Sequence, residues 1–356
     1  ALSARGPKPR LGHAACAVGA SEMYLFGGSD GRVLLRDLWL LAVGAQGLEA
    51  DDCAWASLES TGAAPTGRMG HSLAHIPTAR SLLSFGGFVK GVRGGYSTQI
   101  WLLSLDTLAW SEPRVRAPPG VPLVGRLGCA SCVIRGRMLV VGGSSNGKVI
   151  DEVLAFNVSE EGGEVSIARL PSSGDARAHA AALVASPFAI IMGGAPEAPA
   201  PPLAVLDSRD WHWLPREQLP ELRVAGLSTR AKLTLTPVDG GAADEHMSLV
   251  WGGEMREPDG PPPPLLLRIG GTALSVGDLD DVTAADAAPV GSRAVSSINR
   301  RLLQQVERVA KEDAERGLAS PALSSPSVLA VSPSTPRDAS SVGVPGPRTP
   351  GPVAME

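Results

Sequence analysis

The sequence is poor in several residue types whose abundance would define a class of protein. Its 356 residues include only four cysteines, Cys16, Cys53, Cys129 and Cys132, too few for a disulfide framework in a chain of this length. Aromatic residues make up only 4%, and just two of them are tyrosines. The sequence has no apolar run of the length, about 18 residues, that spans a bilayer, and no signal-peptide pattern at its start. We therefore expect a cytoplasmic protein without membrane attachment.

Neither sign of charge predominates. Lys and Arg number 32 and Asp and Glu 36, which gives a net charge of −4 at pH 7, so these totals do not favour nucleic acid or an anionic membrane as a partner. The sequence contains neither the P-loop pattern of nucleotide-binding proteins nor the H-E-x-x-H pattern of metalloproteases. We expect no cofactor and no catalytic residue, so that the chain is not an enzyme.

What the sequence does contain is a diglycine that recurs at the end of five short apolar runs. The copies are Phe26-Gly27-Gly28, Phe85-Gly86-Gly87, Val141-Gly142-Gly143, Met192-Gly193-Gly194 and Trp251-Gly252-Gly253. Their second glycines follow one another at intervals of 51 to 59 residues, a spacing that indicates a repeat architecture. The 42 glycines and 31 prolines favour many short strands over long helices.

Each diglycine lies within the same succession of features. An Arg and a His precede the first strand, as in Arg10-Leu11-Gly12-His13 and Arg68-Met69-Gly70-His71. The diglycine ends the second strand, an apolar stretch with Asp forms the third, and a Trp such as Trp55 or Trp110 marks the fourth. This succession resembles the kelch repeat over residues 9–278. The resemblance implies an all-β propeller of four-stranded antiparallel blades around a central channel.

We predict a kelch-type β-propeller of five recognisable four-stranded blades over residues 1–283. The repeat weakens along the chain, because unit three has Cys129 where His13 and His71 stand, and unit five lacks the Arg, the His, the Asp and the Trp. Rings of the family that this sequence resembles more often contain six or seven blades than five. A degenerate sixth blade and an incomplete chain therefore stay open as alternatives to a ring of five.

The composition changes near residue 284. Apolar residues recur at three- and four-residue steps within 292–316, at Val295, Ile298, Leu302, Val306 and Val309. This spacing predicts an amphipathic helix, and we assign 284–317 to a linker and this helix. Residues 318–356 contain eight prolines, eight serines and four charged residues, a composition typical of a disordered tail. Its five Ser-Pro or Thr-Pro steps are candidates for phosphorylation.

Two sets of residues suggest chemistry, and each also has a structural interpretation. Cys129 and Cys132 form a C-x-x-C, but no second ligand pair completes a zinc site, and we interpret them as small core residues that point to opposite faces of a strand. His13, His71 and His179 occur once per unit at the same place, whereas a catalytic histidine is expected once. We therefore interpret these histidines as structural and predict no metal site.

The loops that differ between units are the candidates for partner binding. In a propeller blade, the link from second to third strand and the link to the next blade emerge on the same face. The predicted partner-binding residues on this face are Arg10, Arg32, Arg68, Lys90, Arg93, Arg126, Lys148 and Arg177. Because arginine pairs well with carboxylates, we expect an acidic peptide or loop of a protein partner. The alternative for the repeated arginines is that they brace the turns between blades.

The sequence thus predicts a non-catalytic scaffold for protein–protein interaction. One alternative is the recognition domain of a larger protein, such as a kelch-containing phosphatase or ubiquitin-ligase adaptor. Another is a propeller enzyme that acts on a sugar or small acid through the central channel. The sequence carries no signal for an oligomeric state.

Overall fold

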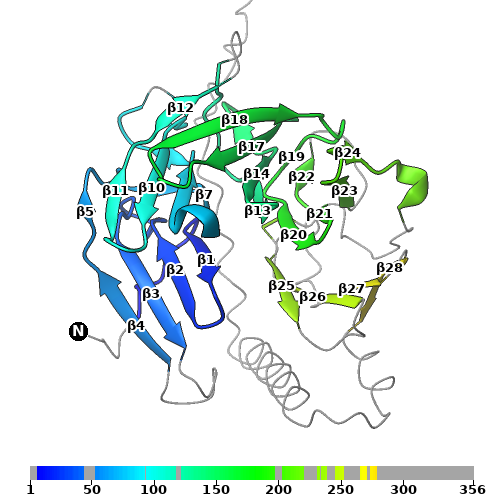
Figure 1. Ribbon diagram of the computed structural model, residues 1–356, viewed down its shortest axis with the longest axis horizontal. Coiled ribbons are helices and arrows are strands. Elements are labelled where there is room, and N and C mark those ends of the chain that lie inside the picture. The colour runs from blue at the N-terminus through cyan, green and yellow to red at the C-terminus, as the bar shows by residue number, and fades with distance from the viewer. Residues whose placement is uncertain are drawn as a thin grey trace, which may run out of the picture. The chain divides into compact units, whose positions relative to one another are not determined.

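Figure 1 shows the computed structural model of the chain. It describes residues 6–43, 53–92, 94–117, 122–196, 203–219, 231–232, 234–238, 245–251, 265–270 and 273–278, with side chains up to residue 232 except those of Pro196 and Gln218. The chain divides into two compact units, residues 1–307 and 308–356, and all described residues belong to the first. The helix predicted within 284–317 and the tail 318–356 lie outside the described residues.

The long elements of the described chain are strands, which form four-stranded antiparallel sheets in chain order. Blade one is β1 (Ala14–Val18), β2 (Glu22–Phe26), β3 (Leu38–Val43) and β4 (Cys53–Leu58). Blade two is β7 (Ser72–Ile76), β8 (Ser81–Phe85), β10 (Ile100–Ser104) and β11 (Ala109–Ser111). Blade three is β13 (Ala130–Ile134), β14 (Arg137–Val141), β17 (Val153–Val158) and β18 (Glu164–Leu170). Blade four is β20 (Ala181–Ala185), β21 (Phe188–Met192), β23 (Leu203–Asp207) and β24 (His212–Trp213).

A fifth four-stranded sheet is described by its backbone and consists of β25 (Thr234–Val238), β26 (Glu245–Trp251), β27 (Leu265–Gly270) and β28 (Ala273–Asp278). Two single turns of 3₁₀ helix, η2 (Pro77–Ala79) and η3 (Arg216–Gln218), are the helical elements among the described residues. The all-β class is therefore confirmed. No helix in this part of the chain is long and apolar enough to cross a membrane.

The first strand of each blade lies innermost. Strands β1, β7, β13 and β20 contact one another in succession, and β25 contacts β20. Figure 1 shows these strands toward the middle of the ring, with β4, β11, β18 and β24 toward its outside. Each blade therefore covers the face of its neighbour, as sheets with two apolar faces require.

Two linkers between blades also contribute to the outer edges. Strand β5 (Thr61–Gly62) leaves blade one and pairs in parallel with β11 of blade two, and β12 (Arg114–Arg116) leaves blade two and pairs in parallel with β18 of blade three. Each linker thus adds a strand to the blade that follows it. The sequence pattern did not predict these edge strands, because they are too short to show a period.

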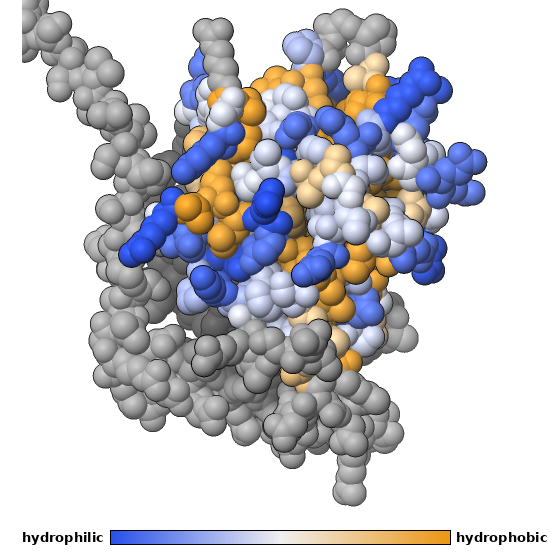
Figure 2. Space-filling view, turned by 90° about the vertical axis from the view of Figure 1, so that its left-hand side faces the viewer, coloured by the Kyte–Doolittle hydropathy of each residue, from blue (hydrophilic) through white to orange (hydrophobic). Residues whose placement is uncertain are grey.

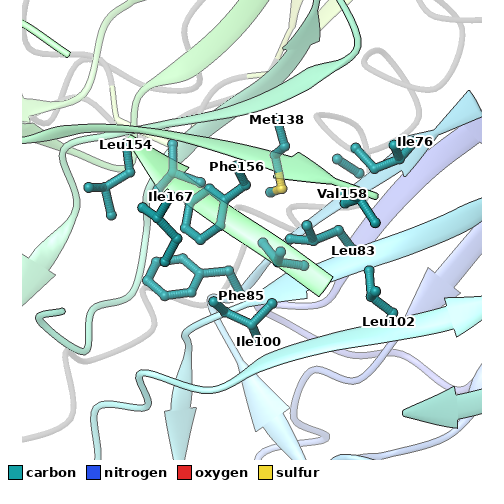
Figure 3. Packing of buried hydrophobic residues seen from close by; sticks show 13 residues of the cluster. Ile76, Leu83, Phe85, Ile100, Leu102, Met138, Leu154, Phe156, Val158 and Ile167 are labelled. Atoms are coloured by element: carbon teal, nitrogen blue, oxygen red, sulfur yellow. The ribbon is translucent and has the colours of Figure 1, made fainter. Parts of the chain in front are cut away.

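The core between blades two and three is a continuous apolar layer (Figure 3). Ile76, Leu83 and Phe85 of blade two pack with Met138 and Phe156 of blade three, all with at most 1% of their surface exposed. The rings of Phe85 and Phe156 lie 5.0 Å apart between centroids. Burying such a side chain contributes about 1.5 to 3 kcal/mol, so this layer holds the two blades together.

The outer-strand tryptophan of blade two packs against blade one. Trp110 is 2% exposed, and its ring lies 4.9 Å from that of Phe26, the residue before the first diglycine. In blade three, Ile167 occupies the equivalent place in register and belongs to the same apolar cluster as Phe85, which explains why that unit needs no Trp. On the outward side of the first blades, hydrophobic and hydrophilic side chains are interspersed (Figure 2).

Candidate interaction face

The diglycine turns form the joints between blades. The amide of the second glycine donates a hydrogen bond to the carbonyl of the arginine that begins the next blade: Gly28 to Arg68 at 2.8 Å, Gly87 to Arg126 at 2.8 Å and Gly143 to Arg177 at 2.9 Å. At the third joint, Gly142 has a φ of 67°, and a methyl group added there would lie 2.2 Å from the carbonyl oxygen of Arg177. Only glycine satisfies both conditions, which confirms that the pairs are architectural.

The repeated arginines lie inside the blades. Arg68 and Arg126 are 0% exposed and Arg177 is 2% exposed, and 4% of the Arg10 side chain is exposed. Each guanidinium donates to the carbonyl of the first glycine of its own blade, at 3.0 to 3.4 Å. This burial corrects the assignment of these four arginines to the partner surface. It supports the alternative that they brace the turns.

A polar residue directly before the third strand completes each brace in blades one to three. The acceptors are Asp37 for Arg10 at 2.7 and 2.8 Å, Gln99 for Arg68 at 3.0 Å, and Glu152 for Arg126. Sequence reasoning missed this set, although the three acceptors occupy one position of the repeat. In blade four, Asp175 lies beside Arg177 instead, at 3.7 Å.

These braces shift the acidity of the groups that form them. Burial raises the pKa of Asp37, but hydrogen bonds from Arg10 and Trp39 outweigh it, so the pKa lies below its ordinary value. Burial lowers the pKa of Arg68 to about 10. Both groups keep their charge at neutral pH.

A ladder of backbone hydrogen bonds joins successive blades just before their innermost strands. The amide of the second residue after each arginine donates to the carbonyl of its counterpart in the preceding blade. The bonds run from Gly70 to Gly12 at 2.7 Å, Gly128 to Gly70 at 2.9 Å, His179 to Gly128 at 2.6 Å and Lys232 to His179 at 2.8 Å. All five residues have φ between 58° and 67°. The position favours glycine, and blades four and five fill it with larger residues.

This ladder shifts the alignment of blade four by one residue. His179 takes the place of Gly12, Gly70 and Gly128, so the prediction that it matches His13 and His71 is wrong, and Ala180 stands at their position instead. The error arose because the signature was aligned on the His itself. Lys232 continues the ladder in unit five. Because each ladder residue lies two positions after the arginine, Arg230 takes the arginine position of unit five, where the sequence pattern had indicated no arginine. Arg230 lies outside the described residues.

His71 is a core histidine. It is 6% exposed, its ring meets that of Phe26 edge-on at 5.3 Å, and neither ring nitrogen has a hydrogen-bond partner among the described residues. Burial, assisted by the charges of Arg68 and His13, lowers the pKa of His71 to about 3. The ring is therefore neutral at physiological pH.

The cysteine pair also belongs to the core. Cys129 packs against the cluster between blades two and three, and Cys132 against the cluster between blades three and four, so their side chains point to opposite faces as predicted. Burial raises the pKa of each thiol to about 12. Protonated thiols of this kind are poor nucleophiles and poor metal ligands.

The loops after the diglycines share one face with the segments that enter each blade. Backbone pairs join Leu11 to Ser29, β6 (Arg68–Met69) to β9 (Phe88–Val89), Leu127 to Ser144, and β19 (Arg177–Ala178) to β22 (Ala195–Pro196). We call residues 29–36, 88–98 and 144–151, together with Leu11 and Met69, the diglycine face. Both kinds of connection thus emerge on one face, as the propeller resemblance implies.

The other predicted cations that the structure describes lie on this face and are exposed. Arg32, Lys90 and Lys148 are exposed and have no ion-pair partner within the described ranges. Arg93 lies outside the described residues. At hairpins on the opposite end, by contrast, Arg80 is paired with Asp106 and Arg209 with Asp207, both at 2.5 Å.

Two diglycine turns match the G-x-S-x-G pattern of serine hydrolases, at Ser29 and Ser145. In those enzymes the serine lies on a turn between a strand and a helix. Here strands follow: β3 after Ser29, and β16 (Lys148–Val149) directly after Ser145. The Ser29 hydroxyl donates to the Val33 carbonyl at 3.0 Å, so the structure assigns it to loop stabilisation.

One further cluster of ligand-type side chains lies on the hairpin between β23 and β24. Ligand atoms of Asp207, Asp210 and His212 lie within 4.8 Å of one another. Arg209 donates four hydrogen bonds of 2.5 to 3.0 Å to the Asp207 carboxylate, one from its backbone amide and three from its guanidinium, and Asp210 contacts the His212 ring. The three side chains are therefore satisfied by protein partners.

Four-stranded blades around an axis, joined by diglycine turns and braced by buried arginines, define a β-propeller of repeated blades. The sequence profile of the KLHDC2/KLHL20/DRC7 Kelch-repeats domain matches residues 47–228, more than half of the chain. The chain belongs to the kelch-repeat family.

Known proteins of several kinds share parts of this sequence. Host cell factor of Drosophila melanogaster is 31% identical over 154 residues, which cover 40% of this chain and 10% of that protein. Adagio protein 3 of Arabidopsis thaliana is 28% identical over 200 residues, 53% of this chain and 31% of that protein. The dynein alpha chain of the flagellar outer arm of Chlamydomonas reinhardtii is 33% identical over 114 residues, 31% of this chain and 2% of that protein. The chain thus spans less than a third of these relatives.

Proposed function

We propose that this kelch propeller is a non-catalytic scaffold in the cytoplasm that binds a protein partner through its diglycine face. Kelch propellers are typically protein-binding modules. The observation that carries the proposal is the set of exposed cations, Arg32, Lys90 and Lys148, that have no carboxylate partner among the described residues. Such cations attract an acidic surface and are open to pair with it.

Charge reversal tests this proposal. The tagged full chain and its Lys90→Glu/Lys148→Glu variant are used to capture proteins from a cell extract, with quantitative mass spectrometry of what is retained. The matched control is Arg114→Glu/Arg135→Glu, which changes the net charge equally at exposed sites outside the diglycine face. We expect the first variant to lose the captured set and the control to keep it. Equal capture by all three proteins would contradict the proposal that the partner binds through the diglycine face.

A second candidate function is the recognition domain of a larger protein. The observation that favours it is that the matched regions cover 31% or less of each relative described above, so that the blades are one part of a longer chain there. Sequencing the full-length transcript tests it. An open reading frame that continues, before residue 1 or after residue 356, into a phosphatase or ubiquitin-ligase domain would support this candidate, and one without such a domain on either side would exclude it.

A further inference from the structure

The diglycine face carries exposed apolar side chains beside its cations. Leu11 is 39% exposed, Val33 51% and Val92 44%, and they are three of the five large hydrophobic residues that are exposed in the described chain. The other two, Val115 and Val124, lie on the linker from blade two to blade three. Exposed apolar side chains mark an interaction site when they belong to one continuous surface, so the connection between the loops that carry them decides the matter.

The loop of blade one holds its side chains in a fixed arrangement. Leu11 and Ser29 exchange backbone hydrogen bonds of 2.9 Å, and the Ser29 hydroxyl binds the Val33 carbonyl. The Asp30 carboxylate accepts from the amides of Arg32 and Val33, both at 2.9 Å, and these bonds lower its pKa. Asp30 is therefore engaged with the backbone of its own loop, while Arg32 and Val33 face outward.

Hydrogen bonds also hold the described residues of the blade-two loop. The Gly95 amide donates to the Val92 carbonyl and the Val89 amide to the Gly95 carbonyl, both at 2.8 Å. Beneath them the rings of Phe88 and Tyr96 meet edge-on at 6.3 Å. This closed turn presents Val92 outward, with the exposed Lys90 in the same loop.

The side chains of Met69 and Asn146 connect these loops to each other. Met69 is half-buried and pairs through its backbone with Phe88. Its Cβ would lie 3.1 Å from a Cβ added to Gly12, the residue next to Leu11. On the other side, the Asn146 side chain reaches Gly94, with 2.9 Å between its Oδ1 and a Cβ placed there. The exposed surface therefore continues from Leu11 across Met69 to the loop of Lys148.

We propose that this surface takes an extended peptide segment of a partner in which an apolar side chain is flanked by carboxylates. The apolar side chain would pack on Leu11, Val33 and Val92, and the carboxylates would pair with Arg32, Lys90 and Lys148. An apolar contact surrounded by polar pairs is the usual anatomy of a binding site. Because hydrogen bonds already hold the described residues of both loops in place, ordering these residues adds little to the entropic cost of forming the complex. The inference rests on the proposed function and specifies its ligand.

The test is to pan a random peptide library displayed on phage against the full chain. We expect enriched peptides to combine Asp or Glu with Leu, Ile, Val or Phe. For the best peptide, labelled with fluorescein, Val33→Ser/Val92→Ser should weaken binding about tenfold or more, because about 1.4 kcal/mol of apolar contact corresponds to a factor of ten. Lys90→Glu/Lys148→Glu should weaken it similarly. Val115→Ser, equally exposed but outside the face, should leave the affinity within a factor of two.

The outcomes separate this inference from the proposed function. Binding that is lost with the lysines but unchanged in the serine variant would overturn the apolar contact and leave the basic face standing. Binding that neither double variant changes would contradict both. Enriched peptides without acidic residues, or a library without any enriched peptide, would overturn the inference while the capture experiment stands by itself. Displacement of the peptide by an RNA oligonucleotide would point to a phosphate backbone as ligand and would also overturn it.

Discussion

At the scale of single residues, one position of the repeat shows how burial decides chemistry. The third residue after the arginine is His13, exposed, in blade one, and His71, buried, in blade two. Cys129 and Ala180 take the same position in blades three and four. No hydrogen bond between blades depends on its side chain, so the position accepts residues of different polarity. A sequence pattern identifies the position but not which of its occupants is buried.

Buried His71 should make the fold sensitive to acid. In the unfolded chain a histidine takes up a proton near pH 6.5, whereas the folded-state pKa of His71 is about 3. The free energy of unfolding should therefore fall as the pH decreases from about 6.5 toward 3, because only the unfolded state binds the proton in this range. His71→Cys, which copies blade three, should flatten the dependence between pH 6.5 and 5, where most carboxylates are still ionised. Urea unfolding at several pH values measures this pH dependence of the free energy of unfolding.

The control is His212→Cys, a substitution at an exposed ring that pairs with Asp210 on the surface. It should keep the slope of the wild-type protein, since exposed pairs contribute little to stability. Equal slopes for the wild type and His71→Cys would show that His71 is solvated in the folded protein, contrary to its burial.

At the scale of the elements, the joints between blades depend on glycine for two separate reasons. Gly136, in the hairpin between β13 and β14, has a φ of 72° but no atom within 4 Å of an added methyl group. Gly142 has a similar φ of 67° and in addition lies against the Arg177 carbonyl. Substitutions at Gly136 and Gly142 therefore separate the cost of a positive φ from the cost of the close approach to the Arg177 carbonyl.

We expect Gly136→Ala to lower the free energy of unfolding by about 1 kcal/mol, the usual cost of a positive φ. Gly142→Ala should cost on the order of 3 kcal/mol or more, because the methyl group also displaces the carbonyl of blade four. Denaturant unfolding of both variants measures the difference. Similar losses in the two variants would mean that the joint can open at little cost, and that the diglycine is retained only for its backbone conformation.

Much of the arrangement of strands and joints could be predicted from the sequence, because strands, diglycines and tryptophans repeat once per blade. The edge strands β5 and β12 could not, since they are two and three residues long and owe their form to the blade they join. Two interpretations were open for the repeated arginines Arg10, Arg68, Arg126 and Arg177: a partner surface, or braces inside the blades. The residues that accept their hydrogen bonds, Asp37, Gln99 and Glu152, would have decided in favour of braces. Those acceptors differ in residue type, so they become visible only when the third strands are aligned.

At the scale of the whole molecule, the stabilising contacts described here lie within the blades and between neighbours. The apolar clusters among the described side chains fall between residues 14 and 213, and the last described strand ends at Asp278. In repeat proteins stability comes from each unit and its interfaces with adjacent units. The predicted boundary at residue 283 follows the fifth sheet directly, and it can be tested by truncation.

A chain that ends at residue 283 is expected to keep the thermal unfolding midpoint of the full chain within about 2 °C, which corresponds to less than about 1 kcal/mol for a domain of this size. It should also capture the same partners, because the diglycine face lies wholly in blades one to three. Scanning calorimetry and the capture experiment measure the two properties on the same pair of proteins. A lower midpoint with unchanged capture would mean that residues 284–356 stabilise the blades without forming the binding site. Unchanged stability with lost capture would move the binding site from the diglycine face to that segment.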